Sequence, residues 1–414
     1  MAADQGWSRI PPSLLTLGEA VEDRDGTSSD EDDLTRWSPR PSMTPGHTGL
    51  QFPFKDPKAA RYLIHFIHKL SPWVDICDPA RHFATEVPKR VCQFPLLAFS
   101  LLAFSSRQVS CKTGVLDSAC EAYYANALRV LIPLLDDPVQ SVSENTLASI
   151  VLLRLYEEFS DVDSGTHLLG SARILAMASS FAAQGGLGEA ASWIVLRQNL
   201  YVSLASRAHV RMDLEQYRSS GLFLGSDDGS FANRAVLLCS QVLSRTMCSD
   251  TTITQQEWAQ LDHEASKWFE SVPPAFRPYY TEDSSPESSG HVFPVILLTR
   301  PAHVLGYQHF YLARILLTVF DPRQWQPSLR TFRQRYKAEE SALCDIRSFL
   351  GLAMSNPKVM TATFTAHHAL HACGSLIRDA AERERVLGFL NEVSAETGWR
   401  SQKLTEKLRA EWAT

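Results

Sequence analysis

The sequence lacks the short motifs by which metal, phosphate and acyl-transfer sites are most easily recognised. None of its cysteines forms a Cys-x-x-Cys pair, the spacing that brings two thiolates to one zinc ion. It contains neither a P-loop nor the Gly-x-Ser-x-Gly turn of serine hydrolases. We therefore predict a protein that is not an enzyme and has no metal, no cofactor and no catalytic residue. The cysteines are widely scattered, as expected of reduced, mostly buried thiols in an intracellular protein. They are Cys77, Cys92, Cys111, Cys120, Cys239, Cys248, Cys344 and Cys373.

Two further absences concern membranes and nucleic acid. The N-terminus has no basic start followed by an apolar core, so we expect no signal peptide. The most apolar run, Pro95 to Phe104, is far shorter than the roughly 20 residues that a membrane-spanning helix needs. The net charge is -6 and the pI is near 6.1, whereas a domain that neutralises phosphates usually has a basic excess. We expect no membrane contact and no surface devoted to nucleic acid.

Helical periodicity is the dominant signal in the sequence. From Ala59 to Trp412 apolar residues recur at three-and-four spacing, and no strand-like alternation of useful length appears. No stretch after residue 50 has the composition of a linker between two domains. We predict an all-α fold, a single domain of about a dozen helices over residues 51–414.

Residues 1–50 differ from the rest of the chain. They are acidic, then rich in proline, and they hold few apolar residues. Such a segment buries too little apolar area to offset its ordering entropy, so we predict a disordered tail. Within it, Asp30 to Leu34 leads to Trp37, a mixture typical of disordered activation segments. A plain solvated tail is the simpler interpretation, and we favour it.

The centre of the fold is expected between Asn145 and Arg207. One helix there, around Val151 and Leu155, is apolar nearly all round, which is typical of a buried helix. The last helix of this stretch carries Trp193 and Leu200 on one face. We expect these two side chains to pack against Val151 and Leu155.

Charged residues are set into these apolar helices, among them Glu157, Glu158 and Arg197. A buried charge is costly unless it is paired. We therefore expect Arg197 to form an ion pair with Glu157 or Glu158.

Short pieces of this stretch, with others before and after it, follow a shared order that resembles a known family. They are Pro53-Phe54, Trp73, Asp78-Pro79-Ala80-Arg81-His82-Phe83, Leu131-Ile132-Pro133-Leu134-Leu135, Leu152-Leu153-Arg154-Leu155-Tyr156-Glu157-Glu158, His167-Leu168-Leu169-Gly170, Gly185-Gly186-Leu187, Trp193-Ile194-Val195-Leu196-Arg197-Gln198, Tyr311-Leu312-Ala313-Arg314-Ile315-Leu316-Leu317, Asp321-Pro322-Arg323, Ala372-Cys373-Gly374, Glu382-Arg383-Glu384, Gly398-Trp399 and Trp412. Together they resemble the fungal-specific transcription factor domain, in its second type, found in regulators similar to the arginine-catabolism repressor. The resemblance runs roughly from Phe52 to the C-terminus. It implies a nuclear protein that controls genes transcribed by RNA polymerase II, often catabolic or secondary-metabolite genes.

The chain departs from this family in one respect. The family's regulators usually carry an N-terminal six-cysteine cluster that holds two zinc ions and places a helix against DNA. The first cysteine here is Cys77, so the cluster is absent. If the chain is complete, we expect it to reach promoter DNA only indirectly, through a DNA-bound regulator or a homo- or heterodimer partner. The sequence leaves open which small-molecule effector, if any, it binds.

The histidines were weighed as metal ligands. His367 and His371 share a helix face at i, i+4, with His368 between them. A zinc protease has a glutamate between such histidines as its general base. We therefore favour ordinary core or surface histidines, and the same holds for His65 and His68.

Two other patterns imitate ligand-binding motifs. The run Gly186 to Ala191 is similar to a dinucleotide-binding loop but follows a helical segment instead of a strand, so it predicts a turn between helices. Asp136-Asp137 is followed by Pro138 without the further acid that a magnesium–diphosphate motif needs, so it predicts a helix stop. A helical enzyme of secondary metabolism, similar to terpene synthases, remains the alternative function.

One basic run precedes the helix expected from Glu339 to Met354. It consists of Arg330, Arg333, Arg335 and Lys337. It fits an import signal or a weak phosphate-binding patch. A solvated helix face is the interpretation we favour, because such runs are common on surfaces.

Overall fold

The computed structural model describes residues 56–136, 143–159, 172–206, 208–247, 252–284, 290–325 and 329–413. Helices make up nearly all of its regular structure, so the predicted all-α class is confirmed. The predicted tail, residues 1–50, lies outside the described residues, and so do Asp137, Cys248 and the run His167 to Gly170.

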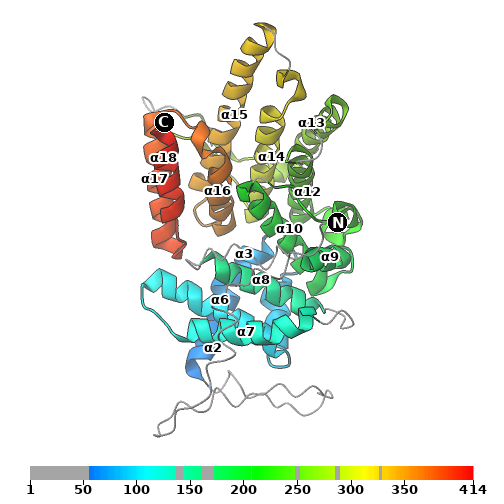
Figure 1. The fold of residues 1–414 in the computed structure, drawn as a ribbon, viewed down its shortest axis with the longest axis vertical. Coiled ribbons are helices and arrows are strands. Elements are labelled where there is room, and N and C mark those ends of the chain that lie inside the picture. Colours follow the sequence, from blue (N-terminus) through cyan, green and yellow to red (C-terminus); the bar gives the residue numbers. More distant parts are fainter. Residues whose placement is uncertain are drawn as a thin grey trace, which may run out of the picture.

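The first half of the chain forms the lower part of the molecule in Figure 1. Local chemistry sets its helix ends. The side chain of Asp56 accepts hydrogen bonds from the backbone at the start of the first helix, Pro57–His65. Gly114, with φ 70°, forms the left-handed cap that ends the helix Pro95–Thr113. The elements are α2 (Pro57–His65), a π-helical turn (Phe66–Leu70), α3 (Ser71–Val74), a 3₁₀ turn (Asp75–Cys77), α4 (His82–Thr85), α5 (Val87–Arg90), α6 (Pro95–Thr113), α7 (Ala119–Asp136) and α8 (Glu144–Glu158).

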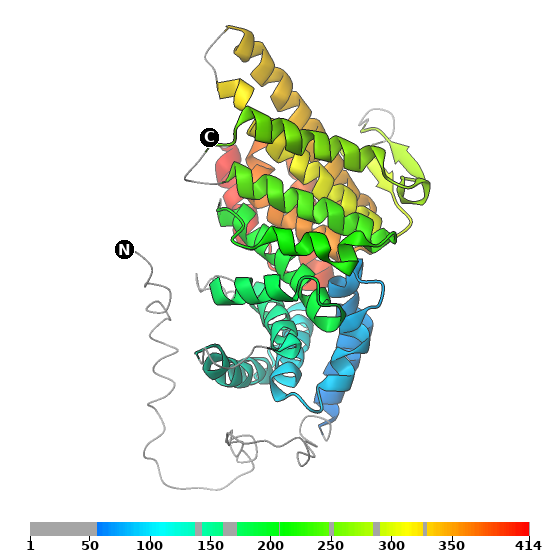
Figure 2. The ribbon, with the colours of Figure 1, turned by 90° about the vertical axis from the view of Figure 1, so that its right-hand side faces the viewer.

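The rest of the chain, from residue 172 onward, forms the middle and upper parts. Figure 2 shows its long helices lying side by side, with α15 extending beyond the others at the top. The helices are α9 (Ala172–Phe181), α10 (Gly186–Ser206), α11 (Gly221–Leu224), α12 (Asp228–Thr246), α13 (Gln255–Glu270), α14 (Pro301–Val319), α15 (Leu329–Ser355), α16 (Met360–Cys373), α17 (Ala380–Thr397) and α18 (Gln402–Trp412). Short 3₁₀ turns cover Leu214–Ser219, Pro274–Phe276, Pro322–Trp325 and Gly374–Leu376.

A small hairpin is the one departure from helices and turns within the described residues. Strands β1 (Tyr280–Glu282) and β2 (Val295–Leu297) pair antiparallel, with Tyr280 opposite Leu297. The backbone N–H of Ile296 donates to the hydroxyl of Ser355 at the end of α15. Each strand is only three residues long, too short for an alternating pattern to be recognised in the sequence.

The core is one continuous cluster of buried apolar side chains that reaches from Ala59 in α2 to Leu408 in α18. At its centre, α8 and α10 are buried on every side. All residues from Asn145 to Tyr156 and from Leu187 to Tyr201 are buried. The prediction that these two helices form the centre of the fold is therefore confirmed.

The four side chains expected to pack together are all buried, at Val151, Leu155, Trp193 and Leu200. The best-defined contacts of Trp193 lie elsewhere, however. Its ring packs edge-on against Tyr217, with 5.0 Å between ring centroids, and its Nε1 donates to the hydroxyl of Ser220 at 2.8 Å. The indole thus joins α10 to the segment that leads into α11.

Truncation at this centre should be costly. We predict that Trp193→Ala and Leu200→Ala each lower the free energy of unfolding by about 2–5 kcal/mol, because each leaves a cavity in a closely packed core. Leu224→Ala is the matched control, since Leu224 is 65% exposed, and should change stability by no more than about 0.5 kcal/mol. Urea unfolding measures all three. Equal, small losses for all would show that α10 is not enclosed.

Candidate functional site

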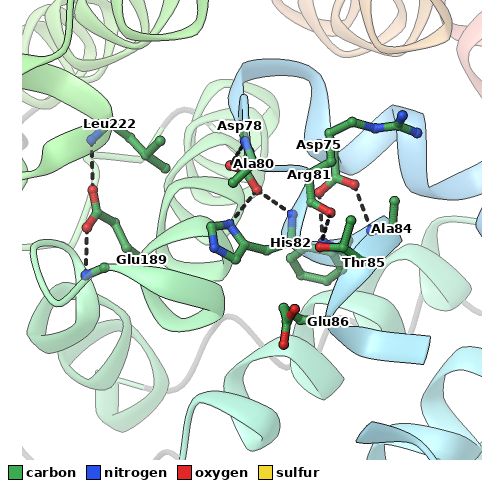
Figure 3. A network of polar contacts seen from close by, with 12 residues as sticks. Asp75, Asp78, Ala80, Arg81, His82, Ala84, Thr85, Glu86, Glu189 and Leu222 are labelled. Carbon is green, nitrogen blue, oxygen red and sulfur yellow. Dashed lines mark hydrogen bonds and ion pairs between the residues drawn. The ribbon is translucent and has the colours of Figure 1, made fainter. Parts of the chain in front are cut away.

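Two aspartates organise the sharp turn between α3 and α4 (Figure 3). The carboxylate of Asp75 accepts hydrogen bonds from the backbone N–H groups of Phe83 and Ala84 at 2.9 and 2.8 Å. The carboxylate of Asp78 accepts from the backbone N–H of His82 at 2.7 Å and lies 2.8 Å from its ring Nδ1. Both carboxylates are buried. They hold the segment Asp78 to Phe83, one of the pieces that carry the family resemblance, against the body of the protein.

The turn contains one strained residue. Arg81 has φ 54° and is the only non-glycine residue with positive φ among those described, a conformation that costs about 1–2 kcal/mol for an L-residue. The hydrogen bonds to Asp75 and Asp78 on either side stabilise it. Burial raises the pKa of Asp75 to about 7, although its two backbone donors act in the opposite direction.

The same segment is joined to α10 and α16 by backbone carbonyls. The guanidinium of Arg197 donates to the carbonyl oxygen of Val74 at 3.1 Å, and the hydroxyl of Thr361 donates to that of Trp73 at 2.9 Å. The expectation that Arg197 pairs with Glu157 or Glu158 was therefore wrong. A buried guanidinium can be satisfied by the C-terminal carbonyls of a short helix as well as by a carboxylate.

The ion pair at the centre is formed by Arg154 instead. Its Nη1 lies 3.6 Å from Glu157 Oε2 and its Nη2 lies 3.4 Å from Glu158 Oε1. The phenol of Tyr124 on α7 donates to Glu157 at 2.9 Å. On the other side, Glu158 Oε2 lies 3.9 Å from His368 Nε2 on α16. This charged group links α7, α8 and α16.

A second network surrounds Tyr201 of α10. Its ring stacks on His368, with 5.1 Å between centroids and 4° between planes. Its hydroxyl lies 2.8 Å from the hydroxyl of Thr365 and 3.4 Å from His309 Nε2. Because Nδ1 of His309 lies 2.9 Å from the carbonyl oxygen of Leu305, this nitrogen donates and Nε2 accepts. Burial lowers the pKa of His309 to about 4, so the ring is neutral at pH 7.

The histidines weighed as metal ligands fall in different surroundings. His367 is buried, and neither of its ring nitrogens has a hydrogen-bond partner among the described residues. Its centroid is 5.4 Å from that of His371 and 5.7 Å from that of Trp399. Burial, with the neighbouring histidines, lowers the pKa of His367 well below its usual value. His65 is hydrogen-bonded to Gln108 at 2.7 Å.

Sequence reasoning missed the role of Glu189. The run Gly186 to Ala191 was predicted to be a turn between helices, but it forms the first turns of α10, and the turn itself lies just before it, at residues 182–185. The buried carboxylate of Glu189 accepts from the backbone of Gly185 at 2.7 Å and of Leu222 at 2.8 Å (Figure 3). It fixes the start of α10 to the start of α11. An acid in the first turn of a helix was the available signal.

The basic run lies on the projecting start of α15, where the side chains of Arg333, Arg335 and Lys337 are exposed. The guanidinium of Arg335 donates to the carbonyl oxygen of Gln324 at 3.0 and 2.9 Å. Asp136 is exposed at the end of α7. The exposure of Arg333, Arg335 and Lys337 fits the interpretation of the basic run as a solvated helix face.

In chemical terms the centre is a set of polar groups that mainly satisfy one another. Within the described ranges no group of three or more histidine, cysteine, aspartate or glutamate side chains is placed to hold a metal ion. The seven cysteines that the structure describes are free thiols, of which Cys92 and Cys344 are exposed. No described helix is both long and apolar enough to cross a membrane.

The Arg154 pair should be important for stability. We predict that Arg154→Ala lowers the free energy of unfolding by about 3–5 kcal/mol, because it leaves two largely buried carboxylates without their counter-charge. Arg218→Ala, which breaks an exposed pair with Glu215, is the matched control and should cost about 0–1 kcal/mol. Thermal and urea unfolding measure both. If the two variants lose equally little, the centre is not held by charge.

Acid should destabilise the protein through His309. A histidine whose pKa is lowered in the folded state contributes stability above its unfolded value of 6.5, and this stability is lost as the pH falls toward about 4. Between about pH 7 and about pH 5 the loss should be on the order of 2 kcal/mol. His309→Gln should remove this part of the pH dependence, whereas His68→Gln, at an exposed position, should retain it. Urea unfolding at the two pH values tests this, and identical slopes for all three proteins would contradict it.

Comparison with known proteins finds a distant relative. No protein-family model matches the chain, and no solved structure matches it. The chain is similar to "Transcription activator AMTR1" of Alternaria alternata, with 20% identity over 368 residues. The aligned region covers 77% of this chain and 47% of that protein. The chain thus spans about half the length of the curated relative that it matches.

Proposed function

We propose that the chain is a fungal-type transcription regulator that acts in the nucleus on genes transcribed by RNA polymerase II. The observation that carries the proposal is the similarity to a fungal transcription activator along 77% of the chain. The ordered sequence pieces that resemble the fungal-specific transcription factor domain support it independently. By the same resemblance, the regulated genes form a catabolic or secondary-metabolite set.

The packing of these pieces is consistent with the proposal. Leu152 to Glu158 lies in α8, Trp193 to Gln198 lies in α10, and both are in the buried centre. The turn from Asp78 to Phe83 follows directly after the carbonyl of Val74 that accepts from Arg197. Pieces that are far apart in the sequence therefore form one structural unit, as expected if the whole set defines a domain.

The chemistry of these residues favours indirect contact with promoter DNA. The 414 residues contain no Cys-x-x-Cys pair and carry a net charge of -6. Specific DNA recognition needs side chains that reach base edges and cations that neutralise phosphates. We infer that these residues act through a DNA-bound regulator or a homo- or heterodimer partner. The buried centre would transmit the effect of such a partner, or of a small effector, between the helices that it links.

The proposal is tested by deleting the gene and measuring all transcripts. We predict altered levels in a small gene set, restored by the wild-type gene. The purified chain should show at most weak DNA binding without sequence preference, lost as salt is raised. A sequence-specific shift by the purified chain alone at physiological salt would contradict indirect recognition. Turnover of a prenyl diphosphate with magnesium would favour the enzyme alternative.

A further inference from the structure

Helix α7 is apolar in sequence but lies at the periphery of the molecule. Figure 1 places it at the outside of the lower part, and α6 is the helix against which it packs most extensively. Tyr124 also stacks on Tyr156 of α8, at 4.3 Å. Only four of its side chains are buried, and they lie on one side: Cys120, Ala127, Leu131 and Leu135. Much apolar surface of this helix therefore remains in contact with solvent.

The exposed residues of α7 form one continuous stripe. They recur at spacings of one, three or four residues, which places them along a single side of the helix. They are Glu121, Ala122, Ala125, Arg129, Ile132, Pro133 and Asp136. Two large apolar residues precede the helix in the adjoining loop, Val115 at 66% and Leu116 at 88% exposure. The stripe mixes small apolar side chains and Ile132 with charged ones, and together with the adjoining apolar loop residues it is suited to an association surface.

Two of the three charges in the stripe, Glu121 and Arg129, are placed symmetrically about Ala125, and the third, Asp136, lies at the C-terminal end of α7. Glu121 lies four residues before Ala125, and Arg129 lies four residues after it. At about 1.5 Å of rise per residue the two charges are about 12 Å apart along the helix, too far to pair within one copy. Arg129 donates to the neighbouring Asn126 at 2.8 Å, which uses one of the five donors of a guanidinium. No ion pair to Glu121 occurs among the described residues.

We propose that this face of α7 binds the same face of a second copy, antiparallel, about a twofold axis at Ala125. In such an interface each contact occurs twice, because residue i meets j and j meets i. Glu121 of each copy lies opposite Arg129 of the other, since both stand four residues from the axis. The small side chain of Ala125 lets the two helices approach closely where they meet. Glu121 and Arg129 of one α7 therefore complement Arg129 and Glu121 of its copy.

A single pair of helices makes a small interface. Stable dimers usually bury about 1,200–2,000 Å² in total, and a helix pair with its adjoining loops falls at the lower end. We therefore expect a reversible dimer with a dissociation constant on the order of micromolar. If the proposed function is correct, a second copy of the chain is one partner of the regulator. The inference itself depends only on the surface of α7 and would also hold for a protein of another function.

The test is charge reversal and restoration, measured by analytical ultracentrifugation over a range of concentrations. The wild-type chain should pass from monomer to dimer. Arg129→Glu places like charges opposite each other twice and should weaken the dimer at least about tenfold. The double variant Glu121→Arg with Arg129→Glu should restore it, because each pair is only exchanged. Arg409→Glu, at an exposed position on α18, changes the net charge equally and should leave the dimer intact.

A crosslink locates the axis. Ala125→Cys, with Cys92 and Cys344 replaced by serine, should give a disulfide-linked dimer under mild oxidation. Ala410→Cys, also exposed on a helix, should not. Unchanged circular dichroism in every variant confirms that the fold is retained.

Three results would overturn the inference. They are a wild-type chain that is monomeric at every concentration, a dimer that survives Arg129→Glu, and a double variant that fails to associate. Association of α7 only with a different protein would remove the second copy as the occupant. A dimer with the predicted charge dependence, in a protein whose deletion changes no transcript, would retain this inference and contradict only the proposed function.

Discussion

Helix α10 is enclosed on all sides, so a polar group on it is costly unless it finds a partner inside the protein. Gln198 Oε1 and Asn199 Oδ1 have none among the described residues, but most of the others do. A buried donor or acceptor left unpaired costs about 1–3 kcal/mol. Four α10 side chains bond to four different neighbours. Ser192 donates to the carbonyl of Ala178 in α9 at 2.7 Å, and Arg197 donates to the end of α3. Gln198 donates to α8 at 3.4 Å, and the hydroxyl of Tyr201 bonds with that of Thr365 in α16.

These bonds explain why segments far apart in the sequence form one unit. The apolar faces of the helices supply most of the stabilising burial, but burial is non-directional. Hydrogen bonds to specific carbonyls fix which helix lies where along α10. Because Glu158 and Tyr201 both contact His368, the charged group on α8 and the neutral network on α10 share a member. Substitutions in the two networks should not act additively.

The helices at the centre of the fold could be predicted from the sequence, but the partners of their charged side chains could not. Helical periodicity and unbroken apolar runs identified α8 and α10, because burial on every side leaves a clear compositional signal. The partner of Glu157 and Glu158 was misplaced, although Arg154 stands three and four residues before them, a spacing that favours pairing within one helix. The hydrogen bond from Arg197 to the carbonyl oxygen of Val74 depends on how two segments far apart in the sequence pack together. No local sequence pattern predicts it. The start of α15 was likewise missed, because residues 333–337 near this end are exposed and show no apolar periodicity.

The candidate site could not be predicted from the sequence. The absence of motif spacing argued against metal and nucleophile chemistry, whereas the polar centre forms from residues of α7, α8, α10, α14 and α16 that meet only in three dimensions. The central claim is that this helical unit regulates transcription and reaches promoters through another protein. Chromatin immunoprecipitation of the tagged chain, with and without its DNA-bound partners, tests that claim most directly. We predict enrichment at a small set of promoters whose naked DNA the purified chain does not bind specifically. No enrichment at any promoter would contradict the account.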